Sequence, residues 1–459
     1  MNDNIENYIQ PGKRVHLVGI GGVSMAPLAE VLKGKGVTVT GSDMSESAAV
    51  AHLRSLDIPV VIGHLPESVA GAGCVIRTAA VHNDNPEIAA ALAGGIPVFE
   101  RAQAWGALMR HYKNALCVAG THGKTTTTSM CTHIFLAAGR DPSVMIGGTL
   151  PILGAGHRVG QGDTIIAESC EYCNSFLSFA PTVAVILNVE ADHLDFFQDL
   201  EDIERSFRQF AELIPASGGY VVANWDNANV RKTLAGFQKS LFRFSLTDHD
   251  AHCRAENITW ENGLPTFNIV VHGEKYAHVS LRVGGEHNLS NALAAASAAY
   301  VLGVPGEAVE KGLDAFTGAG RRFERKGTYH GADVYDDYAH HPDELRALLT
   351  TAKTLGYERV LCAFQPHTYS RTAALFDGFA AVLKLADITI LADIYAARET
   401  DTLGMSSQKL AQHIPGAEYA GSLEAVTARL AELARPGDLI LTVGAGDINL
   451  AGEALVTPG

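Results

Sequence analysis

The segment GTHGKTT, residues 120–126, has the composition of a loop that binds phosphate groups. Gly120 and Gly123 let the backbone approach an anion closely, and the N–H groups at the start of the following helix point at it. Lys124 supplies positive charge for the β- and γ-phosphates of ATP, and the Thr125 hydroxyl is a ligand for Mg²⁺. We expect Lys124 to lie in a solvated loop, so that Lys124→Ala would leave the fold intact. The pattern, a shortened form of the common phosphate loop, predicts ATP binding.

Two polar residues follow buried segments that should form strands beside this loop. Glu168 ends the segment DTIIAE, and His193 ends TVAVILNVEADH. Ligands of open α/β sheets collect beyond the carboxyl ends of the strands, so both side chains could join Thr125 in a magnesium shell. Mg²⁺ prefers oxygen ligands, and a hydrogen-bonded structural role for His193 therefore stays open. Other acids crowd the same ends and cannot be ranked by sequence: Glu171, Glu190, Asp192 and Asp195.

The segment GIGGVS, residues 19–24, is similar to the glycine turn of dinucleotide-binding folds, with Ser24 in place of the third glycine. Asp43 follows about 20 residues later, where an acid meets a ribose hydroxyl in such folds. By itself the motif suggests NAD, or only a tight turn. Beside an ATP loop, it suggests instead a substrate that carries a nucleotide.

Basic residues cluster near residue 320 of an otherwise acidic chain: Arg321, Arg322, Arg325 and Lys326. One interpretation is a solvated linker between domains. The other is that one arginine binds a nucleotide phosphate or stacks on its base. The sequence leaves both open.

Two consecutive histidines, His340 and His341, precede Pro342, Asp343 and Glu344. Proline followed by acids in the first turn is a favourable start for a helix. Consecutive side chains point in different directions, so at most one histidine is expected to face a substrate. Capping or packing is the alternative role for each.

Short apolar runs alternate with helical patterns along the whole chain, which predicts α/β units with parallel sheets. Segments near 106–114 and 318–327 interrupt the pattern and suggest domain boundaries. Residues 240–285 alternate polar and apolar positions between turns, which indicates an antiparallel addition. The sequence therefore predicts three α/β domains.

Composition excludes several other classes. The 459 residues carry a net charge of −15, which disfavours nucleic-acid binding. The seven scattered cysteines, including the Cys170–Cys173 spacing, are expected to be reduced and unpaired. The uncharged stretch near 288–306 is expected to be a buried helix rather than a membrane span. With no recognisable signal peptide, we expect a soluble, cytoplasmic protein without membrane contact.

Taken in order, the motifs resemble those of the Mur ligase family of peptidoglycan synthesis: GIGGVSM, GTHGKTTTT, AESCEYCNSF, NVEADHLD, GEHNLSN, RRFE, DDYAHHPDE and QPHTYSR. The resemblance covers nearly the whole chain. It implies a Rossmann-like domain for the UDP-substrate (1–108), a central domain like P-loop ATPases (109–318) and a Rossmann-like domain for the amino acid (319–459).

The resemblance also implies a reaction in which ATP phosphorylates the muramate carboxylate of UDP-N-acetylmuramate. The amine of L-alanine then attacks the acyl phosphate, giving an amide, ADP and phosphate. ATP and Mg²⁺ are the implied cofactors, and a monomer or weak homodimer is expected. Two alternatives remain: a recycling ligase that joins a tripeptide to the same muramate, and an NAD-dependent oxidoreductase built on the glycine turn.

Residue roles follow from the resemblance alone. The catalytic residues would be Lys124, His193 and Arg371, and the metal would be held or supported by Thr125, Glu168 and His193. Those around ATP would be Gly120, Thr121, His122, Gly123, Lys124, Thr125, Thr126, His287, Asn288, Asn291, Arg322 and Asp337. The residues that would bind the UDP-substrate are Gly19, Gly21, Gly22, Ser24, Asp43 and Thr78. Those that would bind the amino acid are Tyr338, His340 and Arg371.

The chain differs from some members of this family at Thr368, where they carry an arginine, and from several members in a second respect. Those members carry a carbamylated lysine downstream of the segment that here contains His193. Between His193 and Lys232 this chain has no lysine, and arginine cannot supply the free amine that carbon dioxide modifies. We therefore expect no carbamate at this site.

Overall fold

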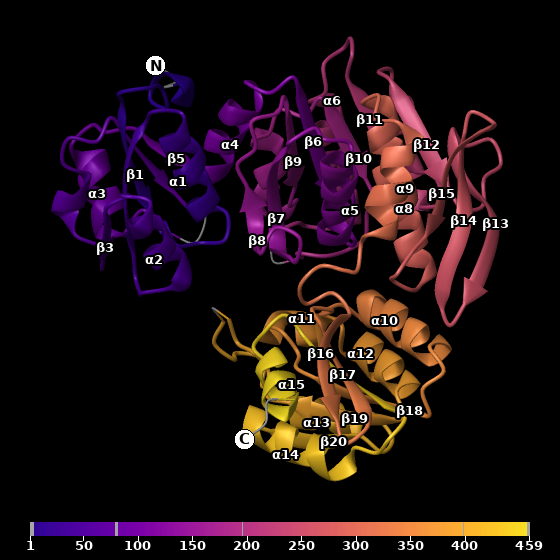
Figure 1. Cartoon of the computed structure of the whole chain (residues 1–459). Coiled ribbons are helices and arrows are strands. Elements are labelled where there is room, and N and C mark those ends of the chain that lie inside the picture. The colour runs from indigo at the N-terminus through magenta and orange to yellow at the C-terminus, as the bar shows by residue number, and fades with distance from the viewer. Residues whose placement is uncertain (1–3, 79–80, 195, 398, 457–459) are drawn as a thin grey trace.

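The computed structural model describes residues 4–78, 81–194, 196–397 and 399–456. They form three α/β units in chain order, each built on its own sheet (Figure 1). This confirms the predicted fold class. No helix among the described residues is long and apolar enough to span a bilayer.

The N-terminal unit is a parallel five-stranded sheet in the order β3-β2-β1-β4-β5. Its strands are β1 (Arg14–Val18), β2 (Thr38–Asp43), β3 (Val60–Ile62), β4 (Cys74–Arg77) and β5 (Val98–Glu100). Its helices are α1 (Met25–Gly34), α2 (Ala48–Ser55), α3 (Pro86–Ala93) and α4 (Arg101–Met109), with 3₁₀ turns η1 (Ile5–Asn7) and η2 (Pro66–Val69).

The central unit has ten strands in the order β15-β14-β13-β12-β11-β10-β6-β9-β7-β8. They are β6 (Asn114–Ala119), β7 (Ser143–Leu150), β8 (Ala155–Arg158), β9 (Thr164–Glu168), β10 (Val183–Ile186), β11 (Tyr220–Asn224), β12 (Leu241–Ser245), β13 (Cys253–Glu261), β14 (Leu264–Val271) and β15 (Glu274–Ser280). Its helices are α5 (Lys124–Ala137), α6 (Leu200–Glu212), α7 (Ala228–Thr233), α8 (Glu286–Val301) and α9 (Gly306–Asp314), with the 3₁₀ segment η3 (Tyr172–Ser178).

Two expectations for the central unit are confirmed and one is wrong. Strands β13 to β15 pair antiparallel at one edge, and the uncharged stretch is the buried helix α8. The strand expected to run to His193 ends at Ile186. Ile186 pairs with Ala119, the last residue of β6, and beyond it Gly120 turns into the phosphate loop, so the ladder has no further partner on that side.

The C-terminal unit has six strands in the order β16-β17-β21-β18-β19-β20, parallel except for β16. The strands are β16 (Glu324–Tyr329), β17 (Ala332–Asp337), β18 (Arg359–Phe364), β19 (Ile388–Ala392), β20 (Glu418–Gly421) and β21 (Asp438–Val443). The helices are α10 (Pro342–Thr354), α11 (Tyr369–Ala374), α12 (Phe376–Val382), α13 (Ser407–Gln412), α14 (Leu423–Leu433) and α15 (Asn449–Val456), with η4 at Leu383–Leu385.

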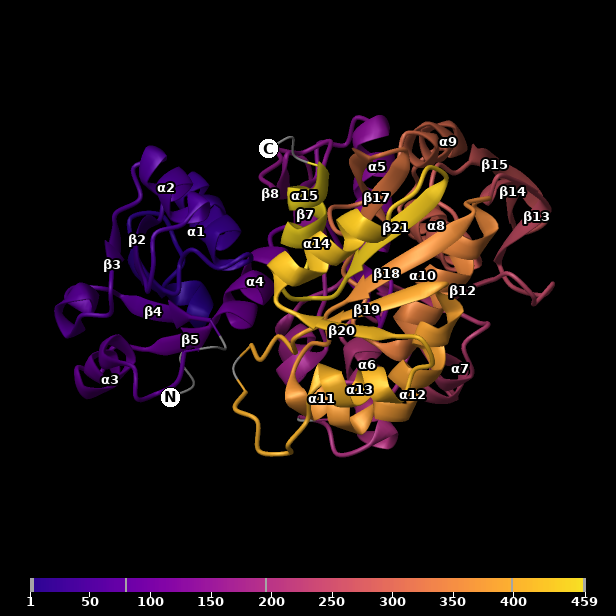
Figure 2. The same cartoon turned by 90° about the horizontal axis from the view of Figure 1, so that it is seen from below.

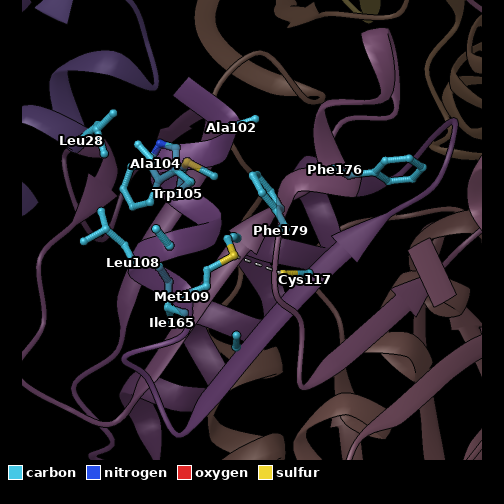
Figure 3. Packing of buried hydrophobic residues seen from close by; sticks show 14 of the residues in the cluster. Leu28, Ala102, Ala104, Trp105, Leu108, Met109, Cys117, Ile165, Phe176 and Phe179 are labelled. Atoms are coloured by element: carbon cyan, nitrogen blue, oxygen red, sulfur yellow. Dashed lines mark hydrogen bonds between the residues drawn. The ribbon is translucent and has the colours of Figure 1, made fainter. Parts of the chain in front are cut away.

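Helix α4 connects the first two units through a shared apolar core. Both views place the N-terminal unit to one side of the molecule, with α4 next to the central unit (Figures 1 and 2). Trp105 and Met109 are buried, and Met109 contacts Cys117 of β6 (Figure 3). Gly106 permits this approach, because a Cβ there would lie 1.8 Å from the carbonyl oxygen of Ser178. Burial along one helix thus fixes the position of the N-terminal sheet against the central one.

Candidate active site

The phosphate loop lies between β6 and α5, at the carboxyl edge of the central sheet. Strands β10 and β9 flank β6 and run parallel to it, as expected. Gly120 and Gly123 have φ angles of 150° and 81°, which favour glycine. A Cβ on Gly123 would lie 2.7 Å from the Asn291 side-chain oxygen. The predicted glycines are therefore required by both conformation and space.

Lys124 does not lie in a solvated loop, so that expectation is wrong. Its ammonium group donates to the carbonyl oxygens of Gly120 at 2.5 Å and Thr121 at 2.9 Å, and lies 3.1 Å from a carboxylate oxygen of buried Glu171. Burial acts to lower the pKa of Lys124, but the neighbouring groups, foremost the Glu171 carboxylate, together outweigh it and raise this pKa. The lysine is thus held charged at the loop before any phosphate arrives.

Thr125 and Glu168 form the oxygen-rich part of the site. The Thr125 hydroxyl donates to the Glu168 carboxylate, with distances of 3.0 and 3.1 Å to its two oxygens. The N–H of Gly147 on β7 donates to the same carboxylate at 2.7 Å, which fixes its orientation. A hydroxyl and a carboxylate side by side are a donor set that suits Mg²⁺. These two residues fit the predicted metal role.

His193 lies in the loop after β10, with a φ angle of 53°. Its Nε2 is 3.9 Å from Glu171 and 3.7 Å from Asp192, and its ring packs on Tyr172 with centroids 4.7 Å apart. Of the other acids in this region, Glu190 accepts from the Asn227 side chain at 2.8 Å, and Asp195 lies outside the described residues.

One group of three potential metal ligands occurs among the described residues: His122, His341 and Asp343. It is distinct from Thr125, Glu168 and His193. It lies where α5 and α10 begin, and the positive end of a helix dipole disfavours a cation. The Nδ1 of His341 also already accepts the N–H of Asp343. We assign no metal to this group.

A cavity of about 590 Å³ lies between the central and C-terminal units. Its walls come from the phosphate loop, the start of α8, the segment before β16 and the start of α10. The predicted nucleotide residues that line it are His122, Gly123, Thr125, Thr126, His287, Asn288, Asn291, Arg322 and Asp337. Gly120, Thr121 and Lys124 complete the adjoining loop. Segments about 200 residues apart thus meet around one space.

Electrostatics inside the cavity differ from those at the surface. Burial lowers the pKa of His287 to about 4, so its imidazole is neutral near pH 7. Burial raises the pKa of Asp337 to about 6, against the opposing effect of Arg322. Asp337 accepts the N–H groups of Phe323 at 2.7 Å and Ala339 at 2.8 Å, so its carboxylate organises the turn that carries Arg322.

The interpretation of the basic cluster as a solvated linker is wrong. Arg322 lines the cavity and stacks with Tyr338, its guanidinium carbon 5.0 Å from the ring centroid. The other three residues of the cluster pair with acids: Arg321 with Asp336, Arg325 with Asp333, and Lys326 with Glu324. Arg322 is therefore the arginine of the cluster placed to meet a ligand.

The residues predicted for the amino acid lie at the same junction. Tyr338 and His340 pack edge to face, with ring centroids 5.6 Å apart. Arg371 lies 3.4 Å from Asp192 of the central unit. Burial acts to raise the pKa of Asp192, but the neighbouring His193 and Arg371 lower it to about 2. The predicted carboxylate-binding arginine thus faces the loop that carries His193.

The predicted UDP-substrate residues gather at the carboxyl edge of the N-terminal sheet. A Cβ on Gly19 would lie 2.8 Å from the Thr78 side chain, so these residues are adjacent. The N–H of Gly21 donates to Asp43 at 2.8 Å, and the N–H of Gly22 to the carbonyl of Gly19 at 3.2 Å. The Ser24 hydroxyl accepts from Arg101 of α4.

Sequence reasoning did not single out two residues that organise the site. Asn188 accepts the N–H of His122 at 2.7 Å and donates to its carbonyl at 3.2 Å. Glu344, read from the sequence only as a helix-start acid, accepts from His122 at 3.1 Å. Both contacts join segments far apart in the chain, and no local pattern signals them.

Three family models match successive parts of the chain: "Mur ligase family, catalytic domain" at residues 14–113, "Mur ligase middle domain" at 118–299 and "Mur ligase, glutamate ligase domain" at 321–446. The chain belongs to the Mur ligase family, and it is an enzyme of the ligase class.

Among relatives, the UDP-N-acetylmuramate–L-alanine ligase of Acetivibrio thermocellus is 45% identical over 96% of this chain and 95% of its own length. That of Caldanaerobacter subterraneus is 44% identical over 98% of both. Among solved structures, the UDP-N-acetylmuramate–alanine ligase of Thermotoga maritima has a TM-score of 0.80 at 28% identity, covering 96% of this chain and 98% of its own. A murein peptide ligase from Psychrobacter arcticus has a TM-score of 0.71 at 26% identity, covering 97% and 98%.

Proposed function

We propose that the chain joins L-alanine to the muramate carboxylate of UDP-N-acetylmuramate in an ATP-dependent reaction of peptidoglycan synthesis. One observation carries the ATP-dependent part: the phosphate loop, with Lys124 charged and Thr125 held by Glu168, adjoins a cavity of about 590 Å³. The names of the relatives that match nearly the whole chain support the choice of substrates.

The proposed reaction has two steps. The muramate carboxylate oxygen attacks the γ-phosphorus of ATP, which breaks the bond to the β-phosphate oxygen and releases ADP. The amine of L-alanine then attacks the acyl carbon, phosphate leaves, and the ammonium proton is lost as the amide forms. Phosphoryl transfer needs positioning and charge neutralisation more than covalent participation by the protein.

Each predicted catalytic residue has a defined task in this scheme. Lys124 exchanges its contact with Glu171 for phosphate oxygens, and the loop N–H groups bind the same anion. Arg371 pairs with the carboxylate of L-alanine and leaves the amine free. His193, between Glu171 and Asp192, supports the carboxylates around the reacting groups.

ATP and Mg²⁺ are the proposed cofactors. Thr125 and Glu168 would hold the metal, with His193 as a supporting residue by family resemblance. Bound Mg²⁺ would neutralise charge on the phosphates during transfer. The proposed domain limits remain 1–108, 109–318 and 319–459, and a cytoplasmic monomer or weak homodimer is proposed as well.

The test is phosphate release from ATP with UDP-N-acetylmuramate and a panel of amino acids. L-alanine should support release with stoichiometric amide formation, and the rates with glycine and L-serine measure the selectivity for the amino acid. A tripeptide in place of L-alanine tests the recycling ligase, and NAD with UDP-N-acetylmuramate tests the oxidoreductase. Tripeptide-dependent release without alanine-dependent release would refute the proposal.

A further inference from the structure

Glu344 links the phosphate loop to the segment that carries the predicted amino-acid residues. One of its carboxylate oxygens lies 3.1 Å from Nδ1 of His122 in the loop. The other accepts the N–H groups of His340 at 2.9 Å and His341 at 3.2 Å. A single side chain therefore contacts both halves of the site, across 222 positions of sequence.

Both ends of this link are fixed by other contacts. His122 is held by the side chain of Asn188, which accepts its N–H and donates to its carbonyl. On the other side, the Nδ1 of His340 lies 3.0 Å from the carbonyl oxygen of Tyr338. Glu344 therefore joins a loop residue held by Asn188 to the turn that carries Tyr338 and His340.

The charge of Glu344 favours the link. Its side chain is 14% exposed. Burial acts to raise its pKa, but the nearby His340 and the hydrogen bond from His122 hold the pKa of Glu344 well below its ordinary value. Hydrogen bonds to a buried carboxylate are stronger than those between neutral groups. The contact between Glu344 and His122, which joins the central and C-terminal units, thus involves a charged group.

We propose that Glu344 is a positioning residue that couples nucleotide binding at the phosphate loop to amino-acid binding at Tyr338, His340 and Arg371. This inference rests on the proposed function and names how its two sites are connected. Nucleotide that orders the loop around His122 also orders the β17–α10 turn through Glu344, so the alanine site is completed only when ATP is bound.

Two variants separate the parts of the link. Glu344→Gln keeps an oxygen that can accept the N–H groups of His340 and His341, and removes the charge facing His122. Glu344→Ala removes the whole contact, including the capping of α10. Glu424→Gln, at an exposed position in the first turn of α14, is the matched control.

The measurement is binding of a non-hydrolysable ATP analogue with Mg²⁺ and UDP-N-acetylmuramate, with and without saturating L-alanine. The coupling factor is the dissociation constant of the ATP analogue without L-alanine divided by its dissociation constant with L-alanine. Thermodynamic linkage requires that the ATP analogue changes the affinity for L-alanine by the same factor. We expect a factor of about five or more in the wild type and the control, in the usual range of about 5–150. It should be smaller in Glu344→Gln and near one in Glu344→Ala. Steady-state kinetics should show a fall in kcat for both variants and an unchanged KM for UDP-N-acetylmuramate.

A merely structural role gives a different result. Both ligands would then bind more weakly to Glu344→Ala, with the coupling factor kept at its wild-type value, and this would overturn the inference. A wild-type factor near one would overturn it too. Failure of the proposed function is tested separately, by phosphate release from the wild-type protein. If the wild type is active and both variants keep the wild-type coupling factor, only the role of Glu344 is refuted.

Discussion

Replacing Lys124 by alanine should damage both activity and stability, because this lysine is the ion-pair partner of a buried carboxylate. The Glu171 side chain is 3% exposed and lies 3.1 Å from the Lys124 ammonium group. Removing one partner of a buried pair leaves an uncompensated charge, which costs about 3–5 kcal/mol. Turnover should fall below detection, since the Lys124 ammonium group is the positive charge held against the loop carbonyls of Gly120 and Thr121.

The double variant Lys124→Ala/Glu171→Gln separates the two effects. Removing the unpaired charge should restore most of the lost stability, by about 2–4 kcal/mol, while ligation stays abolished. Lys311→Ala, an exposed lysine on α9, is the control for loss of a positive charge. Calorimetric unfolding and phosphate release are measured on all four proteins.

Two outcomes would refute this reasoning. Wild-type stability in Lys124→Ala would show that the contact with Glu171 contributes little. Substantial turnover in the folded double variant would show that Lys124 does not neutralise phosphate, and the assignment of the nucleotide site would be lost.

Three further predictions concern the metal, the amino acid and carbon dioxide. Glu168→Gln should raise the Mg²⁺ concentration needed for half-maximal rate and leave KM for UDP-N-acetylmuramate unchanged; an unaltered Mg²⁺ titration would move the ligand role to Glu171. Arg371→Ala should raise KM for L-alanine about ten- to a hundredfold, as expected for a lost charge-assisted pair of about 1.5–3 kcal/mol, and a change confined to the UDP-substrate would contradict it. Activity in decarbonated buffer should not respond to bicarbonate, because residues 194–231 contain no lysine and Lys232 pairs with Glu204 at 2.8 Å. A loss of activity in decarbonated buffer that bicarbonate restores would indicate a carbamate on a lysine from another part of the chain.

Local patterns predicted the elements of the site well. The glycines of the phosphate loop, the end of β9 at Glu168 and the start of α10 at Pro342 follow from steric and capping rules that act over a few residues. The alternation of short apolar runs with helical patterns likewise predicted three α/β units, and these are built on one parallel and two mixed sheets. These features depend on neighbours in sequence, and the sequence contains them directly.

Partners from distant segments could not be predicted in the same way. Lys124 was expected to lie in a solvated loop, but the segment after β9 brings Glu171 against it. The strand predicted to reach His193 stops at Ile186 because its partner β6 stops at Ala119, which is a property of the neighbouring strand. In both cases the outcome depends on an element that the local pattern does not contain.

The contacts that join the units concern function more than stability. His122 meets Glu344 across 222 positions and Arg371 meets Asp192 across 179, and in each contact one partner belongs to the central unit and the other to the C-terminal unit. Such charged contacts add little apolar burial, so their removal should leave each sheet folded. Both contacts lie where the phosphate loop and the loop of His193 approach the predicted amino-acid residues. For the proposed ligation, they therefore set the position of the nucleotide groups relative to the residues that would bind the amino acid.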